Sequence, residues 1–224
     1  LLDSGRFLET AAPLLAGTAA VSFRYVDDAI AQARERATLR NAFGGYVSPA
    51  VMDEILAGNL SPELGGSRKT VCIMFSDIRG YTKRSEGLSP EQVILFLNRY
   101  FDTVVGLIHA NGGCVVSFMG DGIMAVFGAP KPLHDACRAA FDTAVAMLGF
   151  VKTLNMQLVA EGTAPIDIGI GLQFGDAVMG HVGSAVRHDF TAIGDVTNVA
   201  SRLETLTKEV GYRVVVSKSV ADQL

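Results

Sequence analysis

Short apolar runs bounded by glycine or charged residues set the strand pattern of this chain. The runs at 71–75 and 123–127 consist mainly of branched, aromatic and other large apolar side chains. Runs of this length and composition predict buried strands. Strands are expected at residues 69–77, 114–119, 123–127, 166–174, 177–182, 189–193 and 213–216.

Apolar positions three to four residues apart mark helices between these strands. The clearest helix follows Ser89, a good cap, and Pro90, which suits the first helical turn. Its apolar positions recur at helical spacing: Val93, Leu97, Phe101, Val104 and Ile108. Further helices are expected at 133–159 and at 195–209.

The order of these elements predicts the fold class. One strand is followed by a helix, two strands, a helix, further strands, a helix and a last strand. This order favours an α+β fold, a ferredoxin-like sandwich with helices on one face of a mainly antiparallel sheet. The other face would be free for solvent or for a second copy of the chain.

The chain before this pattern divides into two segments. Residues 1–25 are an apolar segment, either the end of a membrane helix or an arm that packs on a partner. Residues 26–60 are expected to form linker helices, and 27–43 forms either a weak coiled coil or a solvated helix on its own domain. The α+β domain is expected to span 61–224 and to continue beyond the last residue.

Composition indicates a globular protein. Hydrophobic residues make up 49% of the 224 residues and charged residues 19%, which excludes a disordered chain. A net charge of −4 without a basic cluster gives no support for a nucleic-acid partner. The three cysteines stand in apolar segments and are expected to be buried, reduced thiols.

Two aspartates beside the apolar runs are candidate metal ligands. Asp77 ends the first strand, and Asp121 lies between two glycines in a turn, where it is expected to be exposed at the tip. A carboxylate at the end of a buried strand is costly unless its charge is compensated. Two such carboxylates repel each other when they meet, and a divalent cation relieves that repulsion.

The helix expected at 195–209 carries a second polar group, with Asp195 as its N-cap. Asn198 and Arg202 are four residues apart and therefore share a face. An amide beside a guanidinium suits an anionic ligand that carries hydroxyls and phosphates. The alternative is that Arg202 pairs with Glu204 or another surface acid. The apolar stripe of this helix is expected to comprise Val196, Val199, Leu203, Leu206 and Val210.

Together these segments resemble the catalytic domain of class III nucleotidyl cyclases, the adenylate and guanylate cyclase family. The resemblance runs from about residue 46 to the end, and three motifs in a fixed order are far more specific than a single glycine pattern. The motifs are Phe75-Ser76-Asp77-Ile78-Arg79-Gly80-Tyr81-Thr82, then Gly112-Gly113 to Gly120-Asp121 and Ala125-Val126-Phe127-Gly128, then Phe190-Thr191 through Gly194-Asp195 to Asn198 and Arg202-Leu203.

The resemblance implies an adenylate cyclase that converts ATP to 3′,5′-cyclic AMP and pyrophosphate. Two Mg²⁺ or Mn²⁺ ions per site are implied at Asp77 and Asp121, helped by the Ile78 carbonyl. They would support in-line attack of the ribose 3′-hydroxyl on the α-phosphorus. Asn198 would position the ribose, and Arg202 would stabilise the charge that builds on the α-phosphate.

The resemblance also implies an assembly. The family places its metal ligands on one subunit and the Asn/Arg pair on the other, so a homodimer with two equivalent sites is implied. The segment before the domain resembles the membrane-proximal end of bacterial receptor-type cyclases. An upstream sensor or membrane domain and a cytoplasmic catalytic domain tethered to the inner membrane are therefore expected.

The positions that select the purine in this family correspond to Ser117 and Thr191. Thr191 fits the bacterial adenylate type, whereas Ser117 is neither the lysine of adenylate cyclases nor the glutamate of guanylate cyclases. A serine hydroxyl can donate or accept, and losing a charge-assisted hydrogen bond costs about 1.5–3 kcal/mol. We expect weak purine selectivity with a preference for ATP over GTP. Arg187, just before the strand that carries Thr191, is expected to hold phosphate.

Other functions stay open on the sequence alone. The domain could be a guanylate or dual-specificity cyclase, or a catalytically weak module for dimerisation or nucleotide sensing, which Ser117 favours. The presence of both aspartates and of the Asn/Arg pair argues against the weak module. Diguanylate cyclases and polymerase palms share the metal-bearing fold, but the Gly-Gly-acidic turn of the former is not found.

Overall fold

The fold is seen in a computed structural model of the chain. Contacts within the chain divide it into two units, residues 1–52 and 53–224. The structure describes residues 24, 27, 30–32, 34, 37–38, 47–184 and 186–224.

The described residues between 24 and 38 are helical. The two alternatives for the linker segment, a coiled coil or a solvated helix, stay predictions. Apart from Arg24, the apolar segment 1–25 lies outside the described residues. Its two alternatives, the end of a membrane helix or an arm that packs on a partner, therefore stay predictions. The first helix after the linker, α2 (Pro49–Leu56), begins at Pro49, as its sequence indicates.

A curved, mainly antiparallel sheet forms the body of the second unit. Its strand order is β2-β3-β1-β4-β5, and β6 pairs with β4 in parallel. The two central strands, β1 and β4, are paired over the full length of β1. The strands are β1 (Gly65–Ile78), β2 (Gly113–Met119), β3 (Gly122–Phe127), β4 (Ile168–Gly183), β5 (His188–Ile193) and β6 (Val214–Val216).

Helices cover both faces of this sheet. The long helix α4 begins as the sequence predicts, because Ser89 and Gln92 form a capping box and Pro90 is its first residue. By length and composition α4 and α5 could each cross a membrane, but both pack against the sheet through buried apolar side chains. The helices of this unit are α3 (Tyr81–Ser85), α4 (Pro90–Ala110), α5 (Ala136–Ala160), α6 (Asp195–Val210) and α7 (Lys218–Ala221).

Each face of the sheet carries its own apolar cluster. Met74 and Ile78 of β1 point toward the cluster that α4 and α5 cover. Val71 and Ile73 alternate with them and point toward a second cluster, which includes Ala200 of α6. Residues 71–76 are therefore all buried, which explains why this strand reads as a continuous apolar run rather than an alternating one.

The strand pair expected at 166–174 and 177–182 is a single strand, β4. Gly175 and Asp176, which separate the two expected strands, both pair with β1, and the Thr70 hydroxyl donates to the Asp176 carboxylate at 2.7 Å. Pairing with a partner of similar length keeps the strand continuous through a step that would otherwise favour a turn.

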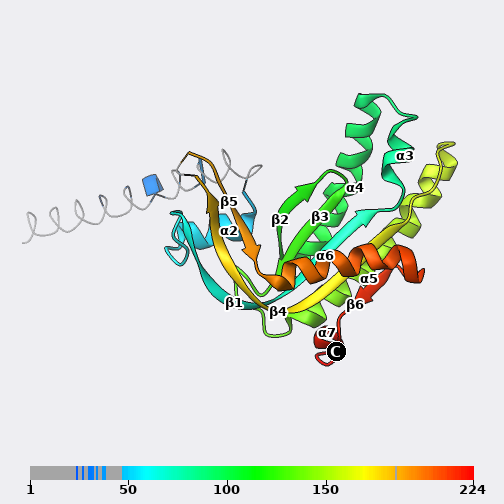
Figure 1. The fold of residues 1–224 in the computed structure, drawn as a ribbon. Helices are drawn as coiled ribbons and strands as arrows, with labels where there is room; N and C mark the ends of the chain where they lie inside the picture. The colour runs from blue at the N-terminus through cyan, green and yellow to red at the C-terminus, as the bar shows by residue number, and fades with distance from the viewer. Residues whose placement is uncertain are drawn as a thin grey trace, which may run out of the picture. The chain divides into compact units, whose positions relative to one another are not determined.

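The expectation that one sheet face would be free is also wrong, because α6 packs there. Figure 1 shows α6 crossing the sheet on the side opposite α4 and α5. Glycines at alternate positions of β4, Gly169, Gly171 and Gly175, point toward this helix, and a Cβ at Gly171 would meet the backbone of Ala200 and Glu204. The missing side chains let the helix approach the sheet closely.

This close packing predicts an asymmetric response to two glycine-to-alanine substitutions. Gly171→Ala should destabilise the domain by about 1–3 kcal/mol, because the added methyl has no room beside the helix backbone. Gly149→Ala, in α5 with open space around it, should gain about 0.5–1 kcal/mol. Urea unfolding measures both free energies, and equal stability of the two variants would contradict the packing described.

Candidate active site

Asp77 and Asp121 meet at one end of the central strands. Asp77 is the penultimate residue of β1, and Asp121 lies in the turn between β2 and β3. The backbone N–H of Ile78 donates to Asp121 Oδ2 at 3.2 Å. Because Ile78 directly follows Asp77, its backbone lies beside both carboxylates. The structure thus brings together the three residues that the sequence proposes as metal ligands.

The environment of Asp121 differs from the exposed tip expected from the sequence. Its carboxyl is half-buried, and burial, a hydrogen bond with Asp77 and the Asp77 charge raise the pKa of Asp121 from 3.8 to about 6. The turn folds back onto the end of β1, which explains the burial. Tyr100, buried on α4 beneath the pair, has its pKa raised by burial and by the same two charges.

The donor set fits a hard divalent cation. Two carboxylates within hydrogen-bond reach of each other repel when both are ionised, and Mg²⁺ or Mn²⁺ binds through one or two carboxylates and completes its shell with water and phosphate oxygens. Among the described residues no group of three or more His, Cys, Asp or Glu side chains could hold a metal. The pair would therefore need oxygens from the backbone and from a ligand to complete a site.

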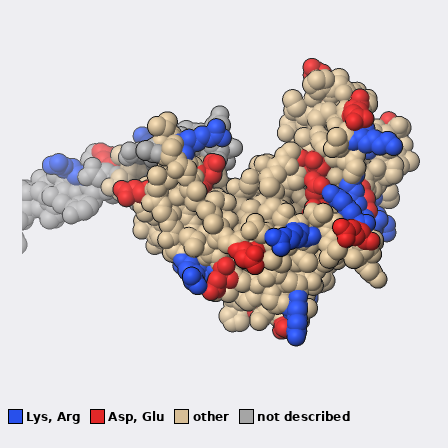
Figure 2. Space-filling view, in the orientation of Figure 1, with Lys and Arg blue, Asp and Glu red and all other residues tan. Residues whose placement is uncertain are grey.

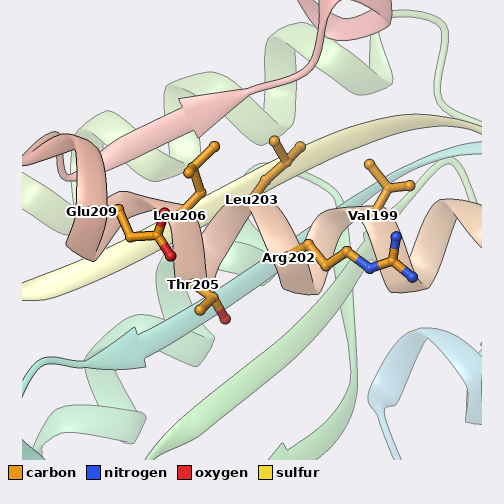
Figure 3. Close-up of a pocket in the computed structure, with 6 residues that line it drawn as sticks. All are labelled: Val199, Arg202, Leu203, Thr205, Leu206 and Glu209. Atoms are coloured by element: carbon orange, nitrogen blue, oxygen red, sulfur yellow. The ribbon is translucent and has the colours of Figure 1, made fainter.

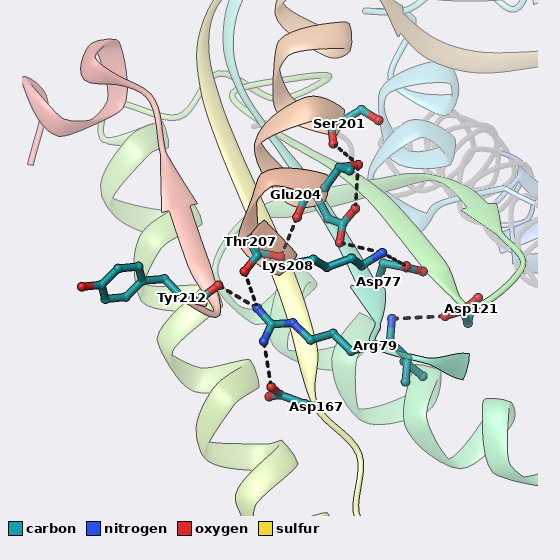
Figure 4. Close-up of polar contacts among 11 residues, drawn as sticks. Asp77, Arg79, Asp121, Asp167, Ser201, Glu204, Thr207, Lys208 and Tyr212 are labelled. Carbon is teal, nitrogen blue, oxygen red and sulfur yellow. Dashed lines mark hydrogen bonds and ion pairs between the residues drawn. The ribbon is translucent and has the colours of Figure 1, made fainter. Parts of the chain in front are cut away.

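Two charged residues that the sequence analysis did not assign complete the environment of Asp77. Lys208 Nζ lies 3.3 Å from Asp77 Oδ2 and 3.8 Å from Glu204 Oε1. Glu204 is only 8% exposed and its pKa is raised, chiefly by burial. Figure 4 shows both side chains reaching from α6 toward Asp77. Their spacing of four residues was the available signal, since it places them on one helix face.

Arg79, just after β1, links the C-terminal end of α6 to the end of this strand. Its guanidinium donates to the backbone carbonyls of Thr207 and Tyr212 at 3.0 and 2.7 Å and to Asp167 at 3.0 Å (Figure 4). The Thr207 carbonyl also accepts from the Gly211 N–H at 3.1 Å, so Arg79 adds a second bond at the C-terminus of the helix. Arg79 belongs to the first sequence motif, but its contacts are structural.

The expected N-cap of α6 is wrong, and of the expected apolar stripe only Val196 belongs to the buried face. Gly194 is the residue at the N-cap, and Asp195 lies in the first turn without a side-chain capping bond. The buried face comprises Val196, Ala200, Glu204 and Thr207. The glycines of β4 let the helix backbone approach the sheet closely. Small side chains such as Ala200 fit in this narrow space, and the larger apolar side chains of α6 point outward.

Asn198 and Arg202 lie on the outward face of α6. Both are exposed, and among the described residues no ion pair involves Arg202. The alternative in which Arg202 pairs with Glu204 is therefore not found. Arg202 borders a shallow hollow of about 360 Å³ beside a row of partly exposed apolar side chains (Figure 3). That row is Val199, Leu203 and Leu206.

Helix geometry separates this face from the aspartate pair. Lys208 marks the side of α6 that meets Asp77. Arg202 precedes Lys208 by six residues, which corresponds to about 9 Å along the helix and about 120° around it, and Asn198 is displaced by about 15 Å. The structure thus does not bring Asn198 and Arg202 to the carboxylates of the same chain.

The three remaining candidates lie on the other strands. Ser117 is in β2, at a bulge opposite β3, and Thr191 is in β5, opposite Gly180. Although β2 and β5 are at opposite ends of the strand order, the curvature of the sheet brings these two strands into contact. Arg187 is exposed in the turn before β5, where its backbone N–H donates to Ser184 Oγ at 3.2 Å.

Surface charge adds one further feature. On the face drawn in Figure 2, acidic and basic side chains are interspersed rather than gathered into patches of one sign. The charges are therefore compensated locally by neighbours, as in the pairs of Lys208 with Asp77 and of Arg79 with Asp167.

A family model decides the identity of this domain. The model described as "Adenylate and Guanylate cyclase catalytic domain" matches residues 66–224. The chain belongs to this family. The match covers every strand and the three motifs, so the cyclase fold expected from the sequence is confirmed, with α6 on the second sheet face as the correction.

Other cyclases are similar to this chain. An adenylate cyclase of Anabaena cylindrica is 36% identical over 184 residues, which cover 82% of this chain and 35% of the relative. The solved guanylyl cyclase Cya2 has a TM-score of 0.66 and 34% identity, covering 71% of this chain and 80% of that one. The adenylyl cyclase CyaB from P. aeruginosa has a TM-score of 0.66 and 32% identity, covering 71% and 82%.

The carboxylate pair of this cyclase domain predicts a measurable titration. In metal-free protein Asp121 should titrate at about pH 6. Because the folded state holds this proton more tightly than the unfolded chain, the group stabilises the fold at low pH. That contribution is lost as the pH rises from about 4 to about 6. Asp77→Asn removes the neighbouring charge and should lower the pKa of Asp121 toward its ordinary value.

Carboxyl ¹³C NMR of metal-free protein measures this pKa directly. Asp142→Asn is the matched control, because Asp142 pairs with Arg138 on the surface of α5 and should leave the titration of Asp121 unchanged. An Asp121 pKa that is the same in the Asp77→Asn variant as in the native protein would show that the two carboxylates do not interact.

Proposed function

We propose that this domain is an adenylate cyclase that converts ATP to 3′,5′-cyclic AMP and pyrophosphate in a homodimer. One observation carries the proposal: the carboxylate pair and the exposed Asn198/Arg202 pair are both present, on surfaces that one chain cannot bring together. A second copy would supply the missing half. The chain spans 35% of the Anabaena relative, so the activity of a longer protein is part of the proposal.

Asp77, Asp121 and Ile78 would bind the triphosphate through metal ions. Held by Asp77, Asp121 and the Ile78 carbonyl, two Mg²⁺ or Mn²⁺ ions would supply Lewis acidity to the ribose 3′-hydroxyl and neutralise phosphate charge. Asp77 lies near the end of β1 and Asp121 in the β2–β3 turn, so both would hold the ions in a fixed place at the ends of paired strands. The partial burial of Asp121 and its repulsion from Asp77 in the metal-free protein would both favour cation binding.

The outward face of α6 would complete the site across the dimer interface. Asn198 can hold the ribose through donor and acceptor groups. Arg202 can donate to the α-phosphate oxygens, where charge increases as the new P–O bond forms and pyrophosphate leaves. The neighbouring row Val199, Leu203 and Leu206 offers apolar surface for a partner. Arg187, exposed before β5, would add a phosphate contact.

The purine would be read by Ser117 and Thr191, which lie on two strands in contact. Both side chains are partly exposed. Neutral hydroxyls donate or accept equally, so discrimination between adenine and guanine should be weak, and Thr191 favours ATP. A dual-specificity cyclase is the second candidate. The similarity to Cya2, a guanylyl cyclase, at 34% identity supports keeping it.

Mixing experiments test the shared site. Asp77→Ala and Arg202→Ala should each abolish cyclic AMP formation, whereas an equal mixture should regain about one quarter of native activity. Half of randomly formed dimers are mixed, and each mixed dimer has one of its two sites intact. Cyclase assays on co-expressed, differently tagged chains measure the recovery.

The matched control for complementation is a mixture of Asp77→Ala with Asp121→Ala. Both changes damage the carboxylate half, so no mixed dimer has an intact site and activity should stay absent. If the Asp77→Ala and Arg202→Ala mixture also stays inactive while native mass spectrometry shows mixed dimers, the shared site is wrong.

Purine preference is tested by initial rates with ATP and GTP in the presence of Mn²⁺. The native domain should favour ATP by less than about tenfold. Ser117→Lys should raise the ratio of ATP to GTP turnover by about tenfold or more, because a charged donor replaces a neutral one. Ser67→Lys, exposed in β1, is the control for an added lysine. A strong native preference for GTP would contradict the assignment to ATP.

A further inference from the structure

Lys208 places a positive charge beside Asp77, one of the two proposed metal ligands. Its ammonium lies 3.3 Å from Asp77 Oδ2, and its own side chain is 46% exposed. Lys208 is in the last turn of α6, where a positive charge also interacts favourably with the helix dipole. Two independent features therefore favour a cation at this point of the domain.

Glu204 provides Lys208 with a second partner. Its carboxylate is 3.8 Å from the same ammonium, its side chain is only 10% exposed, and Oε1 has no hydrogen-bond partner. A buried carboxylate without a compensating group is costly. Lys208 is thus placed between two acids, closer to Asp77 than to Glu204.

Gly169 explains how Glu204 reaches this place. In the β1–β4 ladder Gly169 is the residue opposite Asp77. A Cβ on Gly169 would lie 2.8 Å from Glu204 Oε1, so the missing side chain provides the space for the carboxylate. The fold therefore places a buried acid, a lysine and a proposed metal ligand in contact.

We propose that Lys208 is the built-in counter-ion of the metal-free site and competes with the divalent cation for Asp77. In the metal-free domain its ammonium compensates the charge of Asp77. When the cation binds, Lys208 leaves Asp77 and pairs with Glu204, which keeps its charge compensated. This inference rests on the proposed metal site and adds a positioning role for Lys208 and Glu204.

The test is the affinity for Mn²⁺ alone, measured by electron paramagnetic resonance titration without nucleotide. Lys208→Gln removes the competitor and should tighten Mn²⁺ binding about two- to fivefold, the range of an exposed ion pair. Lys208→Arg keeps the charge and should bind Mn²⁺ like the native domain. Lys218→Gln makes the same change in net charge on exposed α7 and should have no effect.

Each outcome distinguishes the inference from the proposed function. If Lys208→Gln binds Mn²⁺ no more tightly than Lys218→Gln, or binds it more weakly, the competition is wrong. If the native domain shows no saturable Mn²⁺ binding that Asp77→Asn abolishes, the proposed metal site itself fails. Circular dichroism melting in EDTA checks that all variants are folded.

Discussion

The close approach of α6 to the glycine face of β4 determines the arrangement of charged groups in this domain. Without side chains at Gly169 and Gly171 the helix backbone lies directly on the strand. One side of α6 then presents Glu204 and Lys208 to Asp77, and the larger apolar residues are turned outward. A helix at ordinary distance from the sheet would bury its apolar stripe, and its polar residues would point elsewhere.

Electrostatics at the strand ends follows from this packing. Burial, together with the neighbouring Asp77, raises the pKa of Asp121 to about 6. Asp77 nevertheless has a lysine within reach, and Asp121 accepts a backbone hydrogen bond. The site is thus partly compensated in the absence of metal. Partial compensation lets the fold form with two acids side by side and still leaves a driving force for a cation.

Much of the fold could be predicted from the sequence. The apolar runs and the Ser89-Pro90 start of α4 predicted most strands and the three long helices with nearly correct bounds. The single strand β4 could not be predicted from local pattern, because Gly175-Asp176 favours a turn and only pairing with β1 overrides it. The buried face of α6 was also missed, since its largest apolar residues are outside and Ala200 and Thr207 are inside.

The candidate site was predictable where it depends on motif order and unpredictable where it depends on packing. Asp77 and Asp121 were found because charged residues beside apolar runs are conspicuous, and the structure places them together. Lys208 and Glu204 resemble an ordinary surface pair until the glycines opposite them are considered. The repeated glycines of residues 168–175 were the signal that could have revealed both the helix position and this pair.

Asp167 joins parts of the domain that are distant in sequence. One of its oxygens accepts from Arg79 at 3.0 Å and the other from Arg213 at 2.6 Å. Arg79 follows the strand that ends at the site, and Arg213 precedes β6. The Asp167 carboxylate therefore links the strand end to the C-terminal segment, beside the direct bond from Arg79 to the Tyr212 carbonyl. A displacement of the C-terminal segment would therefore be transmitted to the end of β1 through Arg79, which bonds both to Asp167 and to the Tyr212 carbonyl.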